Sequence, residues 1–419
     1  MAHDFPVDEV RRQFPALQRA GSFVFFDNAA GAQVPQHVID AINHHLIDHN
    51  VQRGGRYAKS VAVDRAIEHA RASVAAFLNA QDPNEVAFGM NATTFIRLVS
   101  LAIGQGLGAR NEIVVTELDH EANIATWCAL ERQGARIVWW RAREDGSLAT
   151  EDLQPLLSER TRLVACTLAS NALGTIVDVR GAADLAHAAG AELFLDSVHY
   201  GPHGSIDVQA LGCDYLVCSG YKIFGPHMGF LWGRYEALKR LHTFREDFIA
   251  DAPPDKIEAG TFIFENVAGM DAAIGYLAQL GRTVSGAAGT PNDASLRADV
   301  KSALAAIGGY ERALSREMLR VLQECGARVY GVTEGGSLGQ RVPTFSFTLP
   351  GVAPREVTNA AIRADIGIRD GHLYAPRLMR RLGVPVEQGV VRVSLVHYNT
   401  SAEIHRLGEV LNALVKSRR

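Results

Sequence analysis

The stretch Cys218–His227 (CSGYKIFGPH) sets Lys222 in a glycine-bordered turn directly after the apolar run Tyr215–Cys218. An earlier apolar run, Glu192–Asp196, ends in an aspartate. Short apolar runs of this composition are typical of buried strands. In an α/β sheet, ligands bind beyond the carboxyl ends of the strands. The sequence therefore predicts that Lys222 and Asp196 lie at one site on the edge of a sheet.

The middle of the chain alternates such runs with helical patterns. We expect helices over 94–107, 122–133 and 181–189. The predicted strands cover residues 85–88, 112–116, 136–140, 163–167, 192–195, 215–218 and 229–232. Buried strands that alternate with helices predict a doubly wound, mostly parallel sheet, and so an α/β fold.

The composition changes to small and polar residues around 283–293, which indicates a surface loop or a boundary between domains. The predicted elements beyond it are helices over 296–307, 310–325, 354–364 and 402–416, and strands over 343–349 and 390–396. We therefore expect a large domain over 25–282. A smaller α+β domain would combine residues 1–24 with 283–419.

Bulk properties indicate a soluble enzyme. Two domains are expected because 419 residues is long for one core. The net charge of −4 gives no reason to expect nucleic acid or an anionic membrane as a partner. The start Met1–Val10 does not resemble a secretory signal, and no apolar run is long enough to span a bilayer. Five cysteines without C-x-x-C spacing favour reduced thiols, a cytoplasmic location and no metal site.

Lys222 and Asp196 together suit pyridoxal phosphate chemistry. A lysine amine forms a Schiff base with this cofactor, and a carboxylate keeps the pyridine nitrogen protonated so that the ring accepts electrons. The alternative is a solvated loop lysine and an aspartate that caps a helix.

Other residues after predicted strands could complete such a site. Asn91–Thr94 opens a helix whose backbone amides, with the Ser219 hydroxyl, suit a phosphate; a plain helix cap is the alternative. His120 could stack on the pyridine face and move protons, or be a solvated histidine. Asn171 could bind the phenolic oxygen of the cofactor or only shape a turn. His199 could pair with the same oxygen or cap a loop.

At this point a family resemblance becomes specific. The chain resembles the class V aminotransferase family, and most closely its cysteine desulfurase and selenocysteine lyase branch. That resemblance implies the fold type I architecture of pyridoxal phosphate-dependent transferases, similar to aspartate aminotransferase. It runs from about Phe25 to Thr400 and rests on seven motifs in order: Asp27–Gly31, Asp119–Asn123, Ser170–Thr175, Asp196–His199, Ser219–Lys222, Glu258–Thr261 and Arg392–Thr400.

The resemblance also implies roles for individual residues. Lys222 would be the Schiff-base lysine, Asp196 the pyridinium partner, His120 the stacking histidine and Asn171 the neighbour of the phenolic oxygen. His199 stands where this branch often has glutamine. The phosphate would be held by Ala92, Thr93 and Ser219, and by Thr261 from the other subunit of a homodimer.

For the substrate, the resemblance implies that Arg392 binds the carboxylate of an amino acid, since its guanidinium matches a carboxylate in a bidentate way. A strand arginine paired with a surface acid is the alternative. The loop Asn50–Arg56 resembles one that approaches the partner's site. Ala30, Arg56 and Tyr374 would help to set side-chain specificity.

One motif departs from the branch. Desulfurases carry a nucleophilic cysteine in a pattern like Arg-x-Gly-x-x-Cys, whereas the matching segment Arg369–Pro376 has Tyr374 at the cysteine position. No cysteine follows Cys325. A phenol cannot form a persulfide, so Tyr374 could act as an acid or base, contact substrate, or only pack its loop. With Tyr221 before the lysine, where many relatives have histidine, the chain resembles a subgroup called cysteine desulfurase-like proteins.

We therefore expect an enzyme that acts on an amino acid through an external aldimine. Lys222 or His120 would remove the α-proton, and β-elimination would break a C–S or C–Se bond of a cysteine-like substrate. Transamination or epimerisation at the same site is the alternative reaction. A non-catalytic module built on this fold is a further alternative, against which the intact set of site residues argues.

Overall fold

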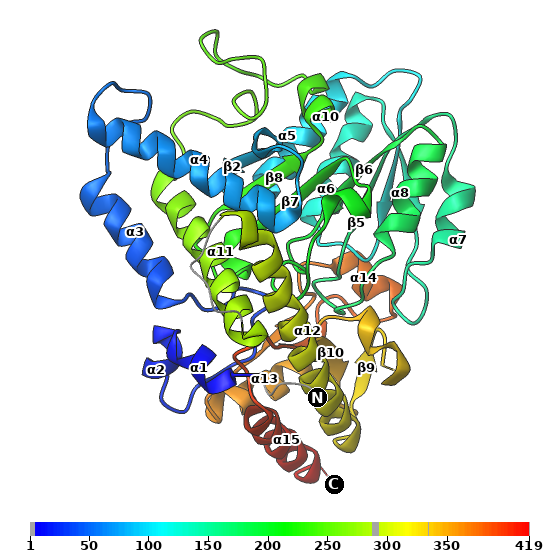
Figure 1. Ribbon diagram of the computed structural model, residues 1–419. Coiled ribbons are helices and arrows are strands. Elements are labelled where there is room, and N and C mark those ends of the chain that lie inside the picture. Colours follow the sequence, from blue (N-terminus) through cyan, green and yellow to red (C-terminus); the bar gives the residue numbers. More distant parts are fainter. Residues whose placement is uncertain (1–4, 287–292, 334, 419) are drawn as a thin grey trace.

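The computed structural model describes residues 5–286, 293–333 and 335–418 (Figure 1). The helices are α1 (Val7–Arg12), α2 (Pro15–Arg19), α3 (Gln36–Asp48), α4 (Ala58–Leu78), α5 (Ala92–Gln105), α6 (Ala122–Cys128), α7 (Thr150–Leu153), α8 (Val179–Ala188), α9 (Val208–Leu211), α10 (Tyr235–Arg240), α11 (Phe264–Ser285), α12 (Asp293–Glu324), α13 (Pro354–Arg363), α14 (Pro376–Arg381) and α15 (Ser401–Lys416). The strands are β1 (Val24–Phe25), β2 (Val86–Gly89), β3 (Glu112–Thr116), β4 (Arg136–Trp140), β5 (Thr161–Thr167), β6 (Glu192–Asp196), β7 (Tyr215–Ser219), β8 (Gly229–Gly233), β9 (Arg328–Tyr330), β10 (Thr344–Thr348), β11 (Ile366–Gly367), β12 (Arg369–Gly371) and β13 (Val390–Ser394).

A seven-stranded sheet forms the centre of the molecule, in the order β2-β8-β7-β6-β5-β3-β4. The strands from β7 to β4 are mutually parallel, and β8 runs antiparallel to both of its neighbours. Each of the seven predicted strands is present within about two residues of its expected bounds. The predicted α/β class with a mostly parallel sheet is confirmed.

Both faces of this sheet are buried, which explains why its strands read as continuous apolar runs. Alternate residues of β6 illustrate the arrangement: Leu193 and Leu195 belong to one core cluster, and Phe194 belongs to another. The first cluster packs against α4, α8 and α11, and the second against α5 and α6. Side chains alternate between the two faces, and both faces are covered by apolar groups. Polar groups can therefore gather only at the edge formed by the strand ends.

A smaller sheet and its helices form a separate layer, seen below the large sheet in Figure 1. This sheet has the antiparallel order β12-β13-β10-β9 and shares a third core cluster with α13 and α15. Helix α15 begins with a capping box, in which the Thr400 hydroxyl and the Glu403 carboxylate each accept a backbone N–H. Strands β1 and β11 form a short parallel pair beside it.

Helix α12 corrects one prediction. The two helices expected over 296–307 and 310–325 are a single helix, Asp293–Glu324, because Gly308 and Gly309 continue it. Glycine inside a helix costs about 1 kcal/mol relative to alanine and does not forbid helical geometry. Packing on both sides offsets this cost, since Val300–Ile307 lie in the large-sheet core and Leu314–Leu322 in the small-sheet core.

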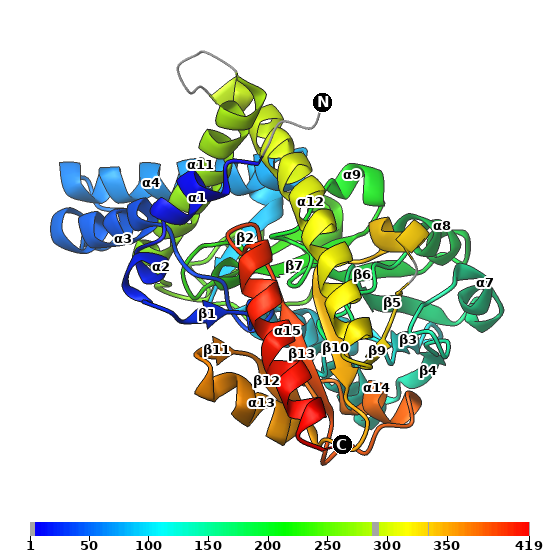
Figure 2. The same cartoon turned by 90° about the horizontal axis from the view of Figure 1, so that it is seen from below.

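The long helix α12 therefore runs alongside both layers, as Figure 2 shows from below. The polar stretch predicted as a loop over 283–293 begins inside α11, which ends at Ser285, and residues 287–292 lie outside the described residues. The expected division into residues 25–282 and 1–24 plus 283–419 stays a prediction.

Leu195 offers a test of the central sheet. It is fully buried on β6, between Cys166 of β5 and Leu216 of β7. Leu195→Ala should lower the free energy of unfolding by about 3 kcal/mol, because it removes buried methyl groups and leaves a cavity. The matched control Leu101→Ala changes a leucine that is 56% exposed and should alter it by less than about 0.5 kcal/mol. Urea unfolding of both variants checks the difference.

Candidate active site

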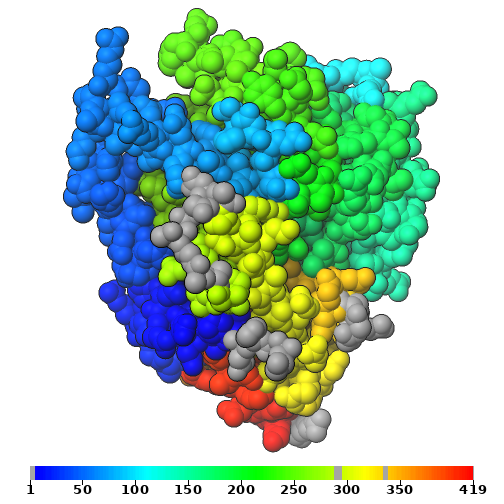
Figure 3. Space-filling view, in the orientation of Figure 1, coloured from blue at the N-terminus to red at the C-terminus, as the bar shows by residue number. Residues whose placement is uncertain are grey.

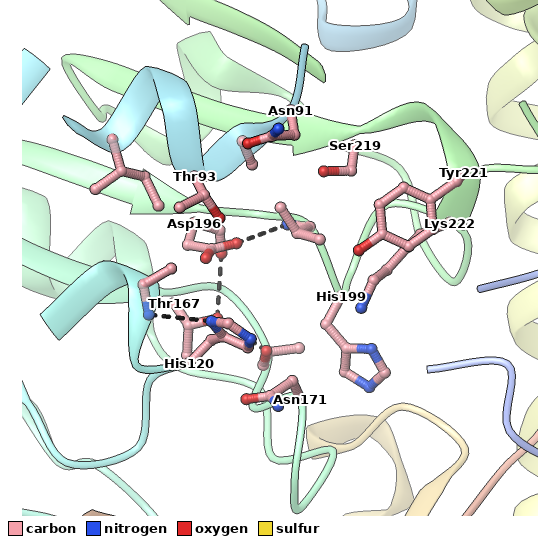
Figure 4. Close-up of a pocket in the computed structure, with 15 residues that line it drawn as sticks. Asn91, Thr93, His120, Thr167, Asn171, Asp196, His199, Ser219, Tyr221 and Lys222 are labelled. Atoms are coloured by element: carbon pink, nitrogen blue, oxygen red, sulfur yellow. Dashed lines mark hydrogen bonds between the residues drawn. The ribbon is translucent and has the colours of Figure 1, made fainter. Parts of the chain in front are cut away.

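Five strand ends deliver side chains to one cavity at the carboxyl edge of the large sheet (Figure 4). Loops after β2, β3, β5, β6 and β7 form its walls. Eight of the predicted site residues line it: Ala92, Thr93, His120, Asn171, Asp196, His199, Ser219 and Lys222. The structure therefore brings together side chains that are far apart in the sequence.

Lys222 lies in a 3-10 turn, Gly220–Lys222, that directly follows β7. Its side chain is buried, and Nζ donates a hydrogen bond to the Ala29 carbonyl oxygen. Burial lowers the pKa of this amine to about 8, with a further lowering by the positive charge of Arg392. The negative charge of Asp196 opposes both effects. A lysine with this pKa reaches its neutral, nucleophilic form near physiological pH.

Asp196 ends β6 and points into the same cavity. Its Oδ1 accepts a hydrogen bond of 2.9 Å from the Val198 amide. Burial raises the pKa of this carboxyl to about 6, and the Val198 amide and Lys222 work against the rise. Asp196 is therefore an ionised, desolvated carboxylate at neutral pH, and such a group is stabilised by a positive partner such as a pyridinium.

The N-terminus of α5 forms another corner of the cavity. Asn91 caps the helix through Oδ1, which accepts the Thr94 amide at 2.9 Å. Gly229 of β8 lies so close that a Cβ there would be 2.7 Å from the Ala92 nitrogen. The hydroxyls of Thr93 and Ser219 line the same corner, and the first amides of a helix have no partner within it. This corner fits a phosphate group.

His120 forms the opposite wall and is neutral. Its Nδ1 accepts the Ala122 amide at 3.1 Å, so the ring proton is on Nε2. Burial lowers the pKa of His120 to about 4, and the positive charges of Lys222 and Arg392 lower it further. A neutral imidazole presents a flat face to the cavity, as expected for a ring that stacks on an aromatic cofactor.

Asn171 and His199 are engaged in ways that the sequence did not predict. The Asn171 amide nitrogen donates to the Leu373 carbonyl at 2.8 Å, while its buried Oδ1 has no partner among the described residues. The His199 Nε2 lies 3.0 Å from the Thr344 hydroxyl. Both side chains still line the cavity, and each has capacity for a further hydrogen bond. An unpartnered buried oxygen, a buried carboxylate and an anion-binding corner together fit pyridoxal phosphate.

Arg392 is not among the residues that line the cavity, and it already has a carboxylate partner. Its NH2 is 2.9 Å from Asp27 Oδ1, and its NH1 donates to the Asn171 carbonyl at 2.9 Å. Asp27 also accepts from Arg369 at 2.8 Å. The arginine–acid pair that was the alternative prediction therefore exists, although Asp27 belongs to the site's own loop rather than to a distant surface.

Four other predicted residues lie outside the walls of this cavity. Ala30 lines a neighbouring hollow with Asp27, and Tyr374 is 52% exposed beside His120. Arg56 and Thr261 are exposed, and Gln52 donates to the Thr261 hydroxyl at 2.5 Å. The corner between α3 and α4, which carries Arg56, projects from the body at the upper left of Figure 3.

The site also contains residues to which the sequence analysis assigned no role. Tyr221 and Thr167 line the cavity, and Asp27 holds the two arginines. Tyr221 is next to Lys222, and Asp27 begins the Asp27–Gly31 motif of the family resemblance. These positions in the sequence were the signals that could have indicated a role in the site.

The cysteines lie elsewhere. All five are free, four are buried, and none lines the cavity. Cys128 alone is partly exposed, and burial raises the pKa of its thiol. Over residues 5–286, 293–333 and 335–418, no cluster of histidine, cysteine and acidic side chains suits a metal ion. No described helix is long and apolar enough to cross a membrane.

Comparison with known proteins connects this geometry to a family. The family model for class V aminotransferases matches residues 24–310 and 287–407. A cysteine desulfurase from Synechococcus elongatus is 34% identical over 98% of the chain, which spans 64% of that relative's length. An aminotransferase-like protein from Gibberella zeae is also 34% identical, over 96% of this chain and 97% of its own. The apo structure of a cysteine desulfurase from Thermococcus onnurineus superposes with a TM-score of 0.87, at 25% identity and with all of both chains covered.

The buried charge of Lys222 gives a stability prediction. Lys222→Met should raise the free energy of unfolding of the cofactor-free protein at pH 7 by about 2 kcal/mol, because it removes a desolvated ammonium. The desolvation of the ammonium lowers the stability of the wild-type protein in full below the pKa of about 8 that Lys222 has in the folded state. This loss of stability vanishes above about 10.5, the pKa of the lysine in the unfolded state. The advantage of the variant should therefore shrink as the pH rises from 8 to 10.5. Denaturant unfolding at pH 7 and pH 10.5 measures it, and an equal advantage at both pH values would contradict the cause.

Proposed function

Because the chain belongs to the class V aminotransferase family and is a pyridoxal-phosphate-dependent enzyme, we propose that it catalyses β-elimination from a cysteine-like amino acid. The bond broken is the one between the β-carbon and sulfur or selenium. The observation that carries this proposal is the combination of a lysine–aspartate cavity with Tyr374 at the position of the desulfurase cysteine. None of the five cysteines lines the cavity, so a leaving group that departs without a thiol acceptor is the simplest chemistry.

The cofactor supplies an electron sink that makes the α-proton of a bound amino acid acidic. Lys222 would hold the cofactor through Nζ and would accept the α-proton of the bound amino acid. A pKa of about 8 suits this step, since the neutral amine is accessible near pH 7 and its conjugate acid can return a proton.

Asp196 and His120 define the position of the cofactor ring. The Asp196 carboxylate, which is ionised at neutral pH, would accept a hydrogen bond from the ring nitrogen and keep that nitrogen protonated. The neutral His120 would stack on one ring face, and Ala92, Thr93 and Ser219 would hold the phosphate. Asn171 and His199, which also line the cavity, would bind the phenolic oxygen.

Arg392 recognises the substrate carboxylate. Two guanidinium groups, those of Arg392 and Arg369, share the single carboxylate of Asp27. The cluster therefore keeps one net positive charge, which the α-carboxylate of an amino acid would neutralise. Ala30 lines the hollow next to Asp27 and would limit the substrate side chain.

A homodimer would complete the site. Thr261 and Arg56 do not line the cavity of their own chain, and both are exposed. The Gln52–Thr261 hydrogen bond joins the projecting α3–α4 corner to the loop that carries Thr261. We propose that this joined surface approaches the phosphate and substrate of the partner's site.

The lyase reaction is tested by product analysis of the holoenzyme with L-cysteine, cysteine sulfinate, selenocysteine and S-substituted cysteines. Pyruvate, ammonium and the sulfur or selenium leaving group should appear in equal amounts, with Lys222→Ala as an inactive control. One equivalent of keto acid together with pyridoxamine phosphate would instead establish transamination. Loss of optical activity without cleavage would establish epimerisation.

Arg392→Lys should raise the KM for the amino acid by about 30-fold, because an ammonium cannot form the bidentate pair of a guanidinium. The exposed Arg380→Lys is the matched control and should leave KM within about twofold. Steady-state kinetics on the best substrate of the product analysis measures both. An unchanged KM in Arg392→Lys would show that another residue binds the carboxylate.

A further inference from the structure

The turn between β12 and α14 has an unusual backbone. Leu373 and Tyr374 both have positive φ angles, 53° and 59°, in the left-handed region that residues other than glycine rarely adopt. Each such residue costs free energy, so two in succession persist only when contacts with the surrounding structure offset that cost. The turn is therefore kept in place by specific contacts.

Those contacts come from the walls of the active-site cavity. The Leu373 carbonyl accepts the Asn171 amide at 2.8 Å, and the Tyr374 carbonyl accepts the Glu121 backbone N–H at 2.8 Å. Within the turn, the Tyr374 amide donates to His372 Nδ1 at 3.1 Å. The turn after β12 of the small sheet is thus attached to two loops of the large sheet. One is the loop after β5, and the other is the loop after β3, which carries His120.

This attachment sets the ring of Tyr374 beside His120. The ring centroids are 5.4 Å apart and the planes differ by 32°, which is within the range of attractive aromatic contacts. His120 is also held at its edge, where Nδ1 accepts the Ala122 amide. The imidazole is therefore held along one edge by a hydrogen bond and contacted by one neighbouring ring.

We propose that Tyr374 is a positioning residue that holds His120 in its stacking orientation through its aromatic ring, not through its hydroxyl. The inference rests on the proposed function only for the presence of the cofactor and does not depend on which bond breaks. Over the described residues, the Tyr374 hydroxyl has no hydrogen-bond partner, and half of the side chain is exposed. At the position where the resemblance leads us to expect a reactive thiol, this chain would use an aromatic contact with the histidine that stacks on the cofactor.

The test measures cofactor affinity and the visible absorption band of the bound cofactor, neither of which requires an amino acid substrate. Tyr374→Phe should keep the wild-type affinity and band, because it keeps the ring. Tyr374→Ala should weaken pyridoxal phosphate binding by about three- to tenfold and shift the band. In a His120→Ala background, Tyr374→Ala should have no further effect, since the residue through which it acts is gone.

Two results would overturn the proposal. One is a loss in Tyr374→Phe as large as that in Tyr374→Ala, which would assign the role to the hydroxyl. The other is an equal loss from Tyr374→Ala with and without His120, which would make the effect independent of the histidine. If Tyr374→Ala does not fold, Tyr374→Leu keeps the bulk without an aromatic ring and takes its place. Failure of the lyase assay leaves these readouts unaffected, so the two proposals are tested separately.

Discussion

The desolvation of Lys222 and Asp196 at the carboxyl edge of the large sheet is the constraint on which the site depends. Apolar side chains cover both faces of the sheet, so the two charged groups lie at the edge of a hydrophobic core that excludes water. Burial lowers the pKa of the amine to about 8 and raises that of the carboxyl to about 6. The pKa values of both groups are thereby brought close to 7. At this pH the amine can act as a nucleophile and base, and the carboxylate can bind a cation.

The arginines beside the cavity share one carboxylate, that of Asp27. Asp27 bridges Arg392 and Arg369, and its loop also supplies the Ala29 carbonyl that accepts from Lys222. One short segment therefore positions the candidate substrate arginine and the candidate cofactor lysine together. A buried Arg392 without such a partner would carry a large desolvation cost, and the two arginines with one carboxylate keep one net positive charge.

The small sheet contributes to the site through contacts that cross long stretches of chain. Its strand β13 supplies Arg392, and the turn after β12 supplies the Tyr374 ring beside His120. These contacts attach the small sheet to the residues around the cavity, although every residue that lines the cavity lies at the end of a strand of the large sheet or in the segment after it. Family membership implies the cofactor, whereas the proposed reaction rests on Tyr374, which stands where the family resemblance leads us to expect a cysteine.

The seven strands of the large sheet, and the eight cavity residues that follow them, were predictable from sequence because strand patterns and strand ends are local properties. The Asp27–Arg392 pair, the contact of the Tyr374 ring with His120 and the continuity of α12 through Gly308 were not. These features depend on side-chain direction and on packing between segments hundreds of residues apart, which no local pattern encodes. The fold class and the lysine–aspartate pair thus follow from the sequence alone. Which charges meet depends on the three-dimensional packing, because desolvation and hydrogen bonding act between neighbours in space.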